Sequence, residues 1–251
     1  LEIEVSAPGV IYLPIQQTDP VAQPHVALSR DAGESWTLAD GPPLNAVTGD
    51  IRDFDASLGN GSAAAMLVDL EHKVDGAASV DSEQILFFTD RAGAAWEARE
   101  IWDKGVVVDA AGVGATINAQ PELSSISMNP MKPNEIWLWG EAGVFKRSDA
   151  GMLPVDLGQI STLDVSLDGA AVYAYSKDGR TGNFSLDAGQ SFAKYNTGFV
   201  VDSVDASTNA PPFAALSGFG RVFYQVPKLG KARPQTFDVS PLDGRTVSDV
   251  Q

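Results

Sequence analysis

The sequence has no cysteine among its 251 residues and only two histidines, His25 and His72. The lack of cysteine excludes disulfide bonds, thiolate nucleophiles and zinc sites built on Cys-x-x-Cys pairs. The two histidines lie far apart and match neither His-Glu-x-x-His nor His-x-His spacing. We therefore expect no metal site and no cofactor, and the redox compartment stays open.

Basic residues and long apolar runs are also scarce. The 17 basic and 33 acidic residues leave a formal net charge of −16, which repels phosphate backbones, so nucleic acid is not expected as a partner. The stretch GVVVDAAGVGATI from 105 to 117 is interrupted by Asp109 and three glycines, and no apolar run approaches the roughly 18 residues that span a bilayer. The sequence thus predicts no transmembrane segment. The start at Leu1, without a basic-then-apolar leader, fits either a mature exported product or a chain trimmed of its targeting segment. We expect an extracellular, periplasmic or cell-envelope location.

What the sequence does contain is short runs of Val, Ile, Tyr, Phe and Trp between turn-forming residues. These runs are VIYLPI (10–15), ILFFTD (85–90), EIWLWG (135–140), VYAYS (172–176) and RVFYQV (221–226). Helical periodicity is weak throughout, so the pattern predicts an all-β protein. Because several runs are apolar at consecutive positions, we expect strands that are covered on both faces by stacked sheets.

One eight-residue pattern recurs along the chain. SRDAGESW (29–36) and SLDAGQSF (185–192) share the order Ser, x, Asp, x, Gly, x, Ser, aromatic. TDRAGAAW (89–96) has Arg91 in place of Asp, and RSDAGMLP (147–154) lacks the aromatic residue. In a tight turn the Asp accepts backbone N–H groups, the Gly adopts positive φ and the aromatic ring packs under the hairpin. The residues assigned to this structural role are Ser29, Asp31, Gly33, Trp36, Asp149, Gly151, Ser185, Asp187, Gly189 and Phe192.

A second element recurs upstream of these copies. Its first strand ends in the triplet acid-x-Ser, or Ser-x-Ser in one copy. A turn and an apolar strand follow. The serines are Ser6, Ser57, Ser127, Ser166 and Ser207. Their spacing indicates a unit of roughly 40 residues with insertions, and four-stranded units of this length are typical of propeller blades.

The eight-residue pattern resembles the Asp-box, or BNR repeat, of the sialidase-like and sortilin-like β-propeller proteins. The resemblance implies a single β-propeller domain over residues 1–251, made of four-stranded blades, about five of them recognisable, with Asp-box turns between the third and fourth strands. The blade-like blocks are approximately 2–40, 51–102, 122–157, 160–197 and 200–240. Residues 246–251 resemble 161–166 and are either a closing strand or the start of a truncated blade.

The resemblance implies the propeller architecture, but it does not imply any activity. Sialidases use an arginine trio, and the segment that would carry one of these arginines has Leu13 in its place. A glycoside hydrolase with two carboxylates remains open, with Asp53 and Asp55, or Asp75 and Asp81, as pairs. No catalytic residue is assigned, and a non-catalytic role is favoured over an enzyme.

Candidate binding loops lie on the face that is opposite the Asp-box turns in this family. They are 69–84, 141–142, 177–180 and 217–220, joined by an insertion between blades at 103–121. The candidate binding residues are Glu71, His72, Asp75, Trp102, Asp109, Glu141, Asp178, Arg180 and Phe219. Residues 206–237 contain no acid, and the basic patch there, which would suit an acidic partner, comprises Arg221, Lys228, Lys231 and Arg233.

The leading hypothesis is a non-catalytic binding or assembly propeller that presents these loops to a protein or glycan partner in an exported or cell-envelope setting. Two alternatives stay open. One is a glycoside hydrolase with an unrecognised active site, and the other is an assembly factor of a membrane complex.

Overall fold

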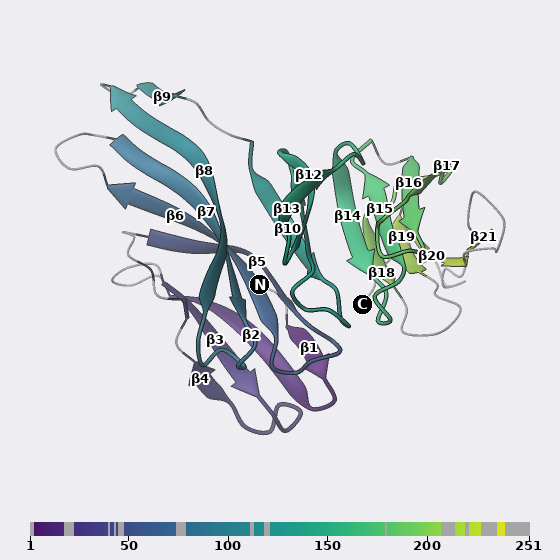
Figure 1. The fold of residues 1–251 in the computed structure, drawn as a ribbon, viewed down its shortest axis with the longest axis horizontal. Helices are drawn as coiled ribbons and strands as arrows, with labels where there is room; N and C mark the ends of the chain where they lie inside the picture. Colours follow the sequence, from purple (N-terminus) through teal and green to yellow (C-terminus); the bar gives the residue numbers. More distant parts are fainter. Residues whose placement is uncertain are drawn as a thin grey trace. The chain divides into compact units, whose positions relative to one another are not determined.

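The structure of the chain is a computed structural model (Figure 1). It describes residues 3–17, 23–39, 41, 42, 44, 48–73, 79–110, 113–117, 121–178, 180–206, 214–218, 221–226 and 235–238, some strand residues by their backbone only. Every regular element in these ranges is a β-strand, so the prediction of an all-β protein is confirmed.

The strands form five sheets, and within each sheet neighbouring strands follow one another in the chain. The first sheet holds β1 (Glu4–Ala7), β2 (Val10–Gln17), β3 (Gln23–Ser29) and β4 (Thr37–Ala39). The second holds β5 (Thr48–Ala56), β6 (Ala64–Lys73), β7 (Ser79–Thr89), β8 (Glu97–Ala110) and β9 (Val113–Ile117). The third holds β10 (Leu123–Met128), β11 (Ile136–Gly140), β12 (Gly143–Ser148) and β13 (Gly151–Val155). The fourth holds β14 (Ile160–Val165), β15 (Val172–Ser176), β16 (Thr181–Ser185) and β17 (Ala193–Asn196), and the fifth β18 (Ser203–Ala206), β19 (Ala214–Gly218), β20 (Arg221–Val226) and β21 (Gln235–Asp238).

Up-and-down antiparallel order fixes where the turns lie. The first and third turns of a four-stranded sheet lie at one edge, and the second turn lies at the other. In the fourth sheet, for example, the turns 166–171 and 186–192 share one edge and the turn 177–180 lies at the opposite edge. We call these two sides, where the ends of the strands lie, the turn edge and the loop edge of a sheet; neither term refers to an edge strand.

The second sheet differs from the sequence prediction, which placed 69–84 and 103–121 in loops. β6 and β7 pair as far as Lys73 and Val80, so only 74–78 lie between them. β8 continues to Ala110 and pairs with β9, the fifth strand of this sheet. The reason is that the β-branched run Val106 to Val108 favours extended backbone, and strand pairing on both sides gives its N–H and C=O groups partners.

Two compact units divide the chain after Met128. The core of the first unit combines residues of the first two sheets, and the rings of Tyr12 and Phe54 lie 5.9 Å apart there. In the second unit Trp137 and Trp139 of β11 pack with apolar residues of β14 and β15. All five residues of β15 are buried, as the expectation of strands covered on both faces requires.

Carboxylates on β5 bind the backbone of β10. Asp53 Oδ2 accepts the Ile126 N–H at 2.7 Å, and Asp55 Oδ2 accepts the Met128 N–H at 2.6 Å. These two aspartates formed one of the candidate catalytic pairs, and the structure instead places them as acceptors between two sheets.

The same kind of contact joins the fourth and fifth sheets. Asp164 Oδ2 accepts the N–H of Ala206 at 2.6 Å, and its Oδ1 accepts the N–H of Val165 at 2.8 Å. Asp55 and Asp164 both stand two residues before the serine of the second recurrent element. In these two copies the acid of the element therefore binds the N–H of the last residue in the first strand of the next sheet.

Glutamine side chains add two more contacts between sheets. Gln16 on β2 accepts the N–H of Ile51 at 2.9 Å and donates to the Gly49 carbonyl at 2.7 Å. Gln84 on β7 does the same with both backbone groups of Leu123, each at 2.8 Å. The side chain belongs to the earlier sheet in each case.

The third block has a different alignment from the one that the sequence suggested. After the first strand of a block, the N–H of Ser57 binds the Ala63 carbonyl and the N–H of Ser166 binds the Ala171 carbonyl. The equivalent bond in the third block is made by Asn129, to the Glu135 carbonyl at 2.8 Å, and not by Ser127. The Asn carboxamide replaces the hydroxyl here, because its Oδ1 accepts the turn N–H groups of two following residues.

Candidate functional site

The turns 29–36 and 185–192 contain the same set of hydrogen bonds. In the first, the Ser29 hydroxyl donates to Asp31 at 2.8 Å and accepts the N–H of Gly33 at 2.8 Å. Asp31 also accepts the N–H of Ser35 at 2.8 Å and its hydroxyl at 2.5 Å. The turn at Ser185 repeats these four bonds at 2.6, 2.8, 2.9 and 2.5 Å. Each carboxylate therefore accepts hydrogen bonds from groups of its own turn.

The aromatic residues of these two turns differ in burial. Phe192 meets the Trp137 ring edge-to-face, with the ring centroids 6.0 Å apart. Trp36 is 44% exposed, and its indole N–H donates to the Gly33 carbonyl at 3.2 Å. Phe192 thus packs against a buried ring of the third sheet, whereas Trp36 contacts its own turn and stays partly exposed.

The turn 89–96 has the same backbone conformation as the turns 29–36 and 185–192 but lacks their Asp carboxylate. Thr89 Oγ1 accepts the N–H of Gly93 at 3.3 Å, as the serine does elsewhere. Ala92 and Gly93 have φ of 52° and 77°, close to the 57° and 91° of Ala32 and Gly33. Arg91 stands where Asp is expected and is exposed. The shape of the turn thus does not depend on the Asp.

The segment 147–154 forms a different turn from the one that its sequence suggested. Ser148 pairs with Gly151, so Asp149 and Ala150 are the two residues at the tip of a tight hairpin. Asp149 is exposed there, and Gly151 has φ of 99°. The reason is that β13 begins directly at Gly151, which leaves no room for the longer turn of the other copies.

Hydrogen bonds lower the pKa of the turn aspartates. The hydroxyl donors Ser185 and Ser191 bring the pKa of Asp187 down to about 2. The Ser35 hydroxyl and N–H, followed by the Ser29 hydroxyl, lower the pKa of Asp31. Each donor stabilises the ionised carboxylate.

We expect the contribution of Asp187 to stability to depend on pH. Because its folded pKa lies below the unfolded value of about 3.9, this contribution is present above about pH 4 and is lost as the pH falls through about 2. The difference in melting temperature between the wild type and Asp187→Asn should therefore shrink between these limits. A difference that stayed constant across this range would contradict the role of the ionised carboxylate.

The candidate binding residues are distributed over several strands and turns. Glu141 is exposed at the loop edge of the third sheet, and Asp178 and Arg180 share the loop-edge turn of the fourth. The Asp178 carboxylate accepts the hydroxyl of Ser176 and the N–H of Arg180, which together lower its pKa. Asp178 is thus part of its own turn.

The remaining candidates lie in the second sheet or outside the described residues. Trp102 is half-buried and donates its indole N–H to the Pro121 carbonyl at 3.1 Å. Glu71 and His72 belong to β6 and Asp109 belongs to β8, whereas all three were expected in loops. Arg221 is the first residue of β20, which is the predicted strand RVFYQV. Asp75, Phe219, Lys228, Lys231 and Arg233 lie outside the described residues, as do 246–251.

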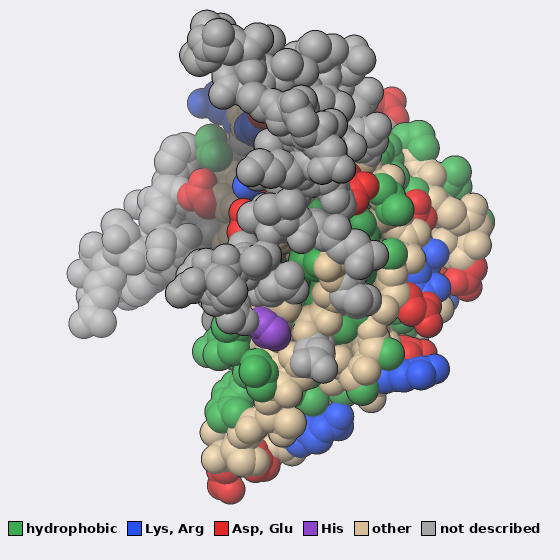
Figure 2. Space-filling model, turned by 90° about the vertical axis from the view of Figure 1, so that its left-hand side faces the viewer, with side chains coloured by type: hydrophobic (Ala, Val, Ile, Leu, Met, Phe, Trp, Pro, Cys, Tyr) green, Lys and Arg blue, Asp and Glu red, His purple; other side chains and the backbone are tan. Residues whose placement is uncertain are grey.

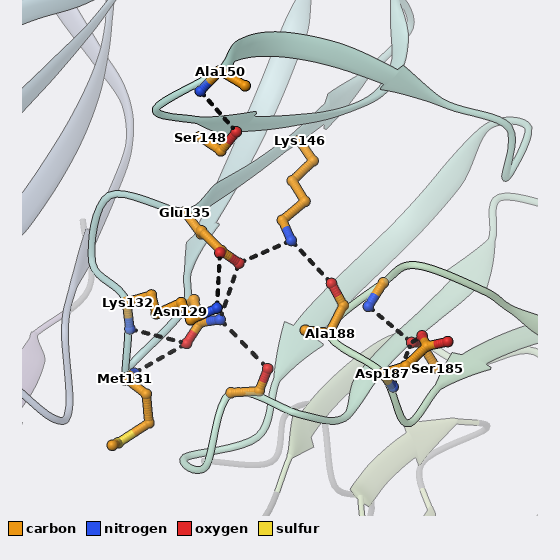
Figure 3. Close-up of polar contacts among 12 residues, drawn as sticks. Asn129, Met131, Lys132, Glu135, Lys146, Ser148, Ala150, Ser185, Asp187 and Ala188 are labelled. Carbon is orange, nitrogen blue, oxygen red and sulfur yellow. Dashed lines mark hydrogen bonds and ion pairs between the residues drawn. The ribbon is translucent and has the colours of Figure 1, made fainter.

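A polar cluster that the sequence did not reveal lies at the turn edge of the third sheet (Figure 3). Lys146 of β12 is 2.8 Å from the Glu135 carboxylate, donates to the Ala188 carbonyl at 2.9 Å, and lies 5.5 Å from the centre of the Trp137 ring. Burial raises the pKa of Glu135, and hydrogen bonds and charge from Lys146 and then Lys132 lower it further than burial raises it. The cluster joins the third sheet to the turn at Asp187. Its sequence signal is a lone lysine inside the strand GVFKRS.

A pocket of about 430 Å³ adjoins this cluster, between the turns 129–135 and 148–151. Lys132, Glu135 and Asp149 line it, so charges of both signs face the space. Lys132 and Glu135 already pair at 3.3 Å. The pocket therefore has no clear preference for a charged ligand.

Within the described residues no group of three or more His, Asp or Glu side chains is placed to hold a metal ion. They also contain no helix with the length and hydropathy of a membrane span. Acidic and basic side chains lie interspersed on the described part of the face shown in Figure 2. The net negative charge of the chain thus coexists with local basic groups.

Comparisons with known proteins identify the fold. The chain matches no family model and no curated protein sequence. It is similar to the structure of YCF48 bound to D1 peptide, a propeller protein, with a TM-score of 0.56 and 13% identity over 97% of this chain and 67% of that one. The fold is that of a β-propeller. The chain is also similar to the crystal structure of the major Malassezia sympodialis allergen Mala s 1, with a TM-score of 0.51 and 7% identity over 96% of this chain and 78% of that one.

Proposed function

We propose that the chain is a non-catalytic propeller that binds a peptide segment of a partner protein at the loop edges of its sheets. In this proposal the five sheets are the blades of a single domain. The turns 29–36 and 185–192 are its Asp-box turns, since both contain the Ser, Asp and Gly interactions that this motif needs. An exported or cell-envelope setting is part of the same proposal.

The observation that carries the proposal is the similarity to a propeller whose structure contains a bound peptide. This similarity favours a peptide over a glycan as the ligand. The loop edge is the better candidate for the contact, because Glu141 is exposed there, whereas the carboxylates of Asp31 and Asp187 at the turn edge bind groups of their own turns. Loops carried by a rigid sheet scaffold are a common place for binding residues.

The state of the acidic side chains supports binding over hydrolysis. A glycosidase needs two carboxylates that face the same sugar bond. Asp53 and Asp55, one of the two candidate pairs, are engaged with backbone N–H groups of β10. The proposal therefore leaves these two acids as structural residues.

A peptide-array screen with the purified chain tests this function. We expect one peptide family to bind, and hydrogen exchange of the complex to show protection at 141–143 and 177–181 and none at 186–192. Glu141→Ala should change the affinity, because Glu141 is exposed at the loop edge. Asp149→Ala is the matched control, since Asp149 is an exposed acid at the turn edge of the same sheet.

Two results would overturn the proposal. One is turnover of a glycoside that a single carboxylate substitution abolishes. The other is a peptide complex whose affinity responds to Asp149→Ala and not to Glu141→Ala.

A further inference from the structure

A groove lies at the turn edge of the first two sheets, within the first unit. It has a volume of about 340 Å³, and β4 and the turn 90–95 form two of its walls. A methyl group at Gly93 would lie 3.2 Å from Cβ of Ala39, so the two walls approach closely at these residues. The volume falls within the usual range of about 300 to 1,000 Å³ for ligand sites and suits one or two amino-acid residues.

Two arginines line this groove in a chain with a net charge of −16. Arg30 makes no ion pair with any residue that the structure describes. Arg91 lies 3.6 Å from the Asp90 carboxylate, and both side chains are about two-thirds exposed, so this pair is weak. The guanidinium groups are thus available to a ligand.

The turn that carries Arg91 lacks the carboxylate that its relatives have. In the turns at Ser29 and Ser185, an Asp accepts the N–H and the hydroxyl of the serine four residues later. In the turn 89–96 the Asp is replaced by Arg91 and that serine by Ala95. The same backbone shape therefore occurs here with a positive side chain and without the negative charge.

One wall of the groove is apolar. Leu38 lines it and is 63% exposed, and Ala39 lies beside it on β4. A ligand that combines a carboxylate with an adjoining apolar side chain would match both the arginines and this wall.

We propose that this groove binds a carboxylate of a peptide, between Arg30 and Arg91, with a neighbouring apolar residue of the peptide on Leu38. This site is separate from the loop edges of the proposed function, and it stands or falls independently of them. The carboxylate belongs either to a Glu or Asp side chain or to a peptide C-terminus, which share the same chemistry.

Calorimetric titration of the full chain with three short peptides tests the site. The probes are acetyl-Gly-Glu-Leu-Gly-amide, its Gln counterpart, and acetyl-Gly-Gly-Leu with a free C-terminus. We expect at least one carboxylate peptide to bind about tenfold more tightly than the Gln peptide, since a charge-assisted bond is lost in the latter. Whichever carboxylate peptide binds more tightly identifies the source of the carboxylate. Equal affinity of all three peptides would overturn the proposal.

Variants of the groove sharpen the test. Arg30→Gln and Arg91→Gln should each weaken carboxylate binding about tenfold, whereas Lys194→Gln, at an exposed cation on β17, should leave it unchanged. The double variant Arg91→Asp, Ala95→Ser introduces the Asp and Ser of the other turns and replaces one guanidinium of the groove by a carboxylate, so it should abolish binding of the carboxylate peptide. Binding that survives in this variant, while its melting temperature shows that it is folded, would contradict the site.

Discussion

Gly189→Ala is expected to lower the free energy of unfolding by about 3 to 4 kcal/mol, the sum of a backbone cost and a packing cost. Gly189 has φ of 81°, a conformation that a residue with a Cβ adopts at a cost. An added Cβ would also lie 2.4 Å from Cζ2 and 2.5 Å from Cη2 of Trp137. Trp137 is 1% exposed and is held by the Phe192 ring, so it has little room to move.

Gly198→Ala separates these two costs. Gly198 has nearly the same φ, 82°, and a Cβ there would meet nothing within 4 Å. This variant should therefore lose only about 1 to 2 kcal/mol. Denaturant unfolding of both variants measures the difference. Equal losses would show that the indole of Trp137 does not fix the position of the turn.

Asp164→Ala should lower the free energy of unfolding by about 2 to 3 kcal/mol, the range for a lost charged hydrogen bond that leaves a buried donor unpaired. The donor is the N–H of Ala206, a residue that is 4% exposed on β18. The same substitution removes the acceptor of the Val165 N–H on β14. The fourth and fifth sheets should therefore both lose stability, which hydrogen exchange at β14 and β18 would detect.

Two further variants control for charge. Asp202→Ala removes a negative charge from an exposed position only four residues before Ala206, and should have little effect. Asp164→Asn keeps an acceptor oxygen and should lose less stability than Asp164→Ala. A loss at Asp202 as large as the loss at Asp164 would show that net charge, and not the hydrogen bond to Ala206, determines the result.

The features that the sequence predicted depend on neighbouring residues. The strand Val172–Ser176 was predicted from its apolar run, and its burial on both faces follows from stacked sheets. The hydrogen bonds of Asp31 and Asp187 span at most four residues, so the spacing of Ser, Asp, Gly and Ser was enough to predict that these carboxylates serve turns. Local chemistry determines both features.

The features that the sequence did not predict depend on distant contacts. Asp53 was considered as a catalytic acid, and its partner Ile126 is 73 residues away. Lys146 finds the Ala188 carbonyl 42 residues later. The pairing of β8 with β9 was missed because the glycines and Asp109 in that stretch are typical of a loop, whereas the valines before them favour a strand. No short-range pattern specifies such partners.

The contacts between sheets share a direction along the chain. Asp55, Gln16, Gln84, Lys146 and Asp164 all lie on the earlier sheet, and each binds the backbone of a later one. During synthesis, a sheet that has already formed would offer side-chain acceptors and donors to backbone that has not yet emerged from the ribosome. Because a backbone group is present whatever the residue, the later sheet can vary in sequence without losing these contacts. In each of these pairs of sheets, the side chains that specify the contact therefore belong to the sheet that comes earlier in the chain.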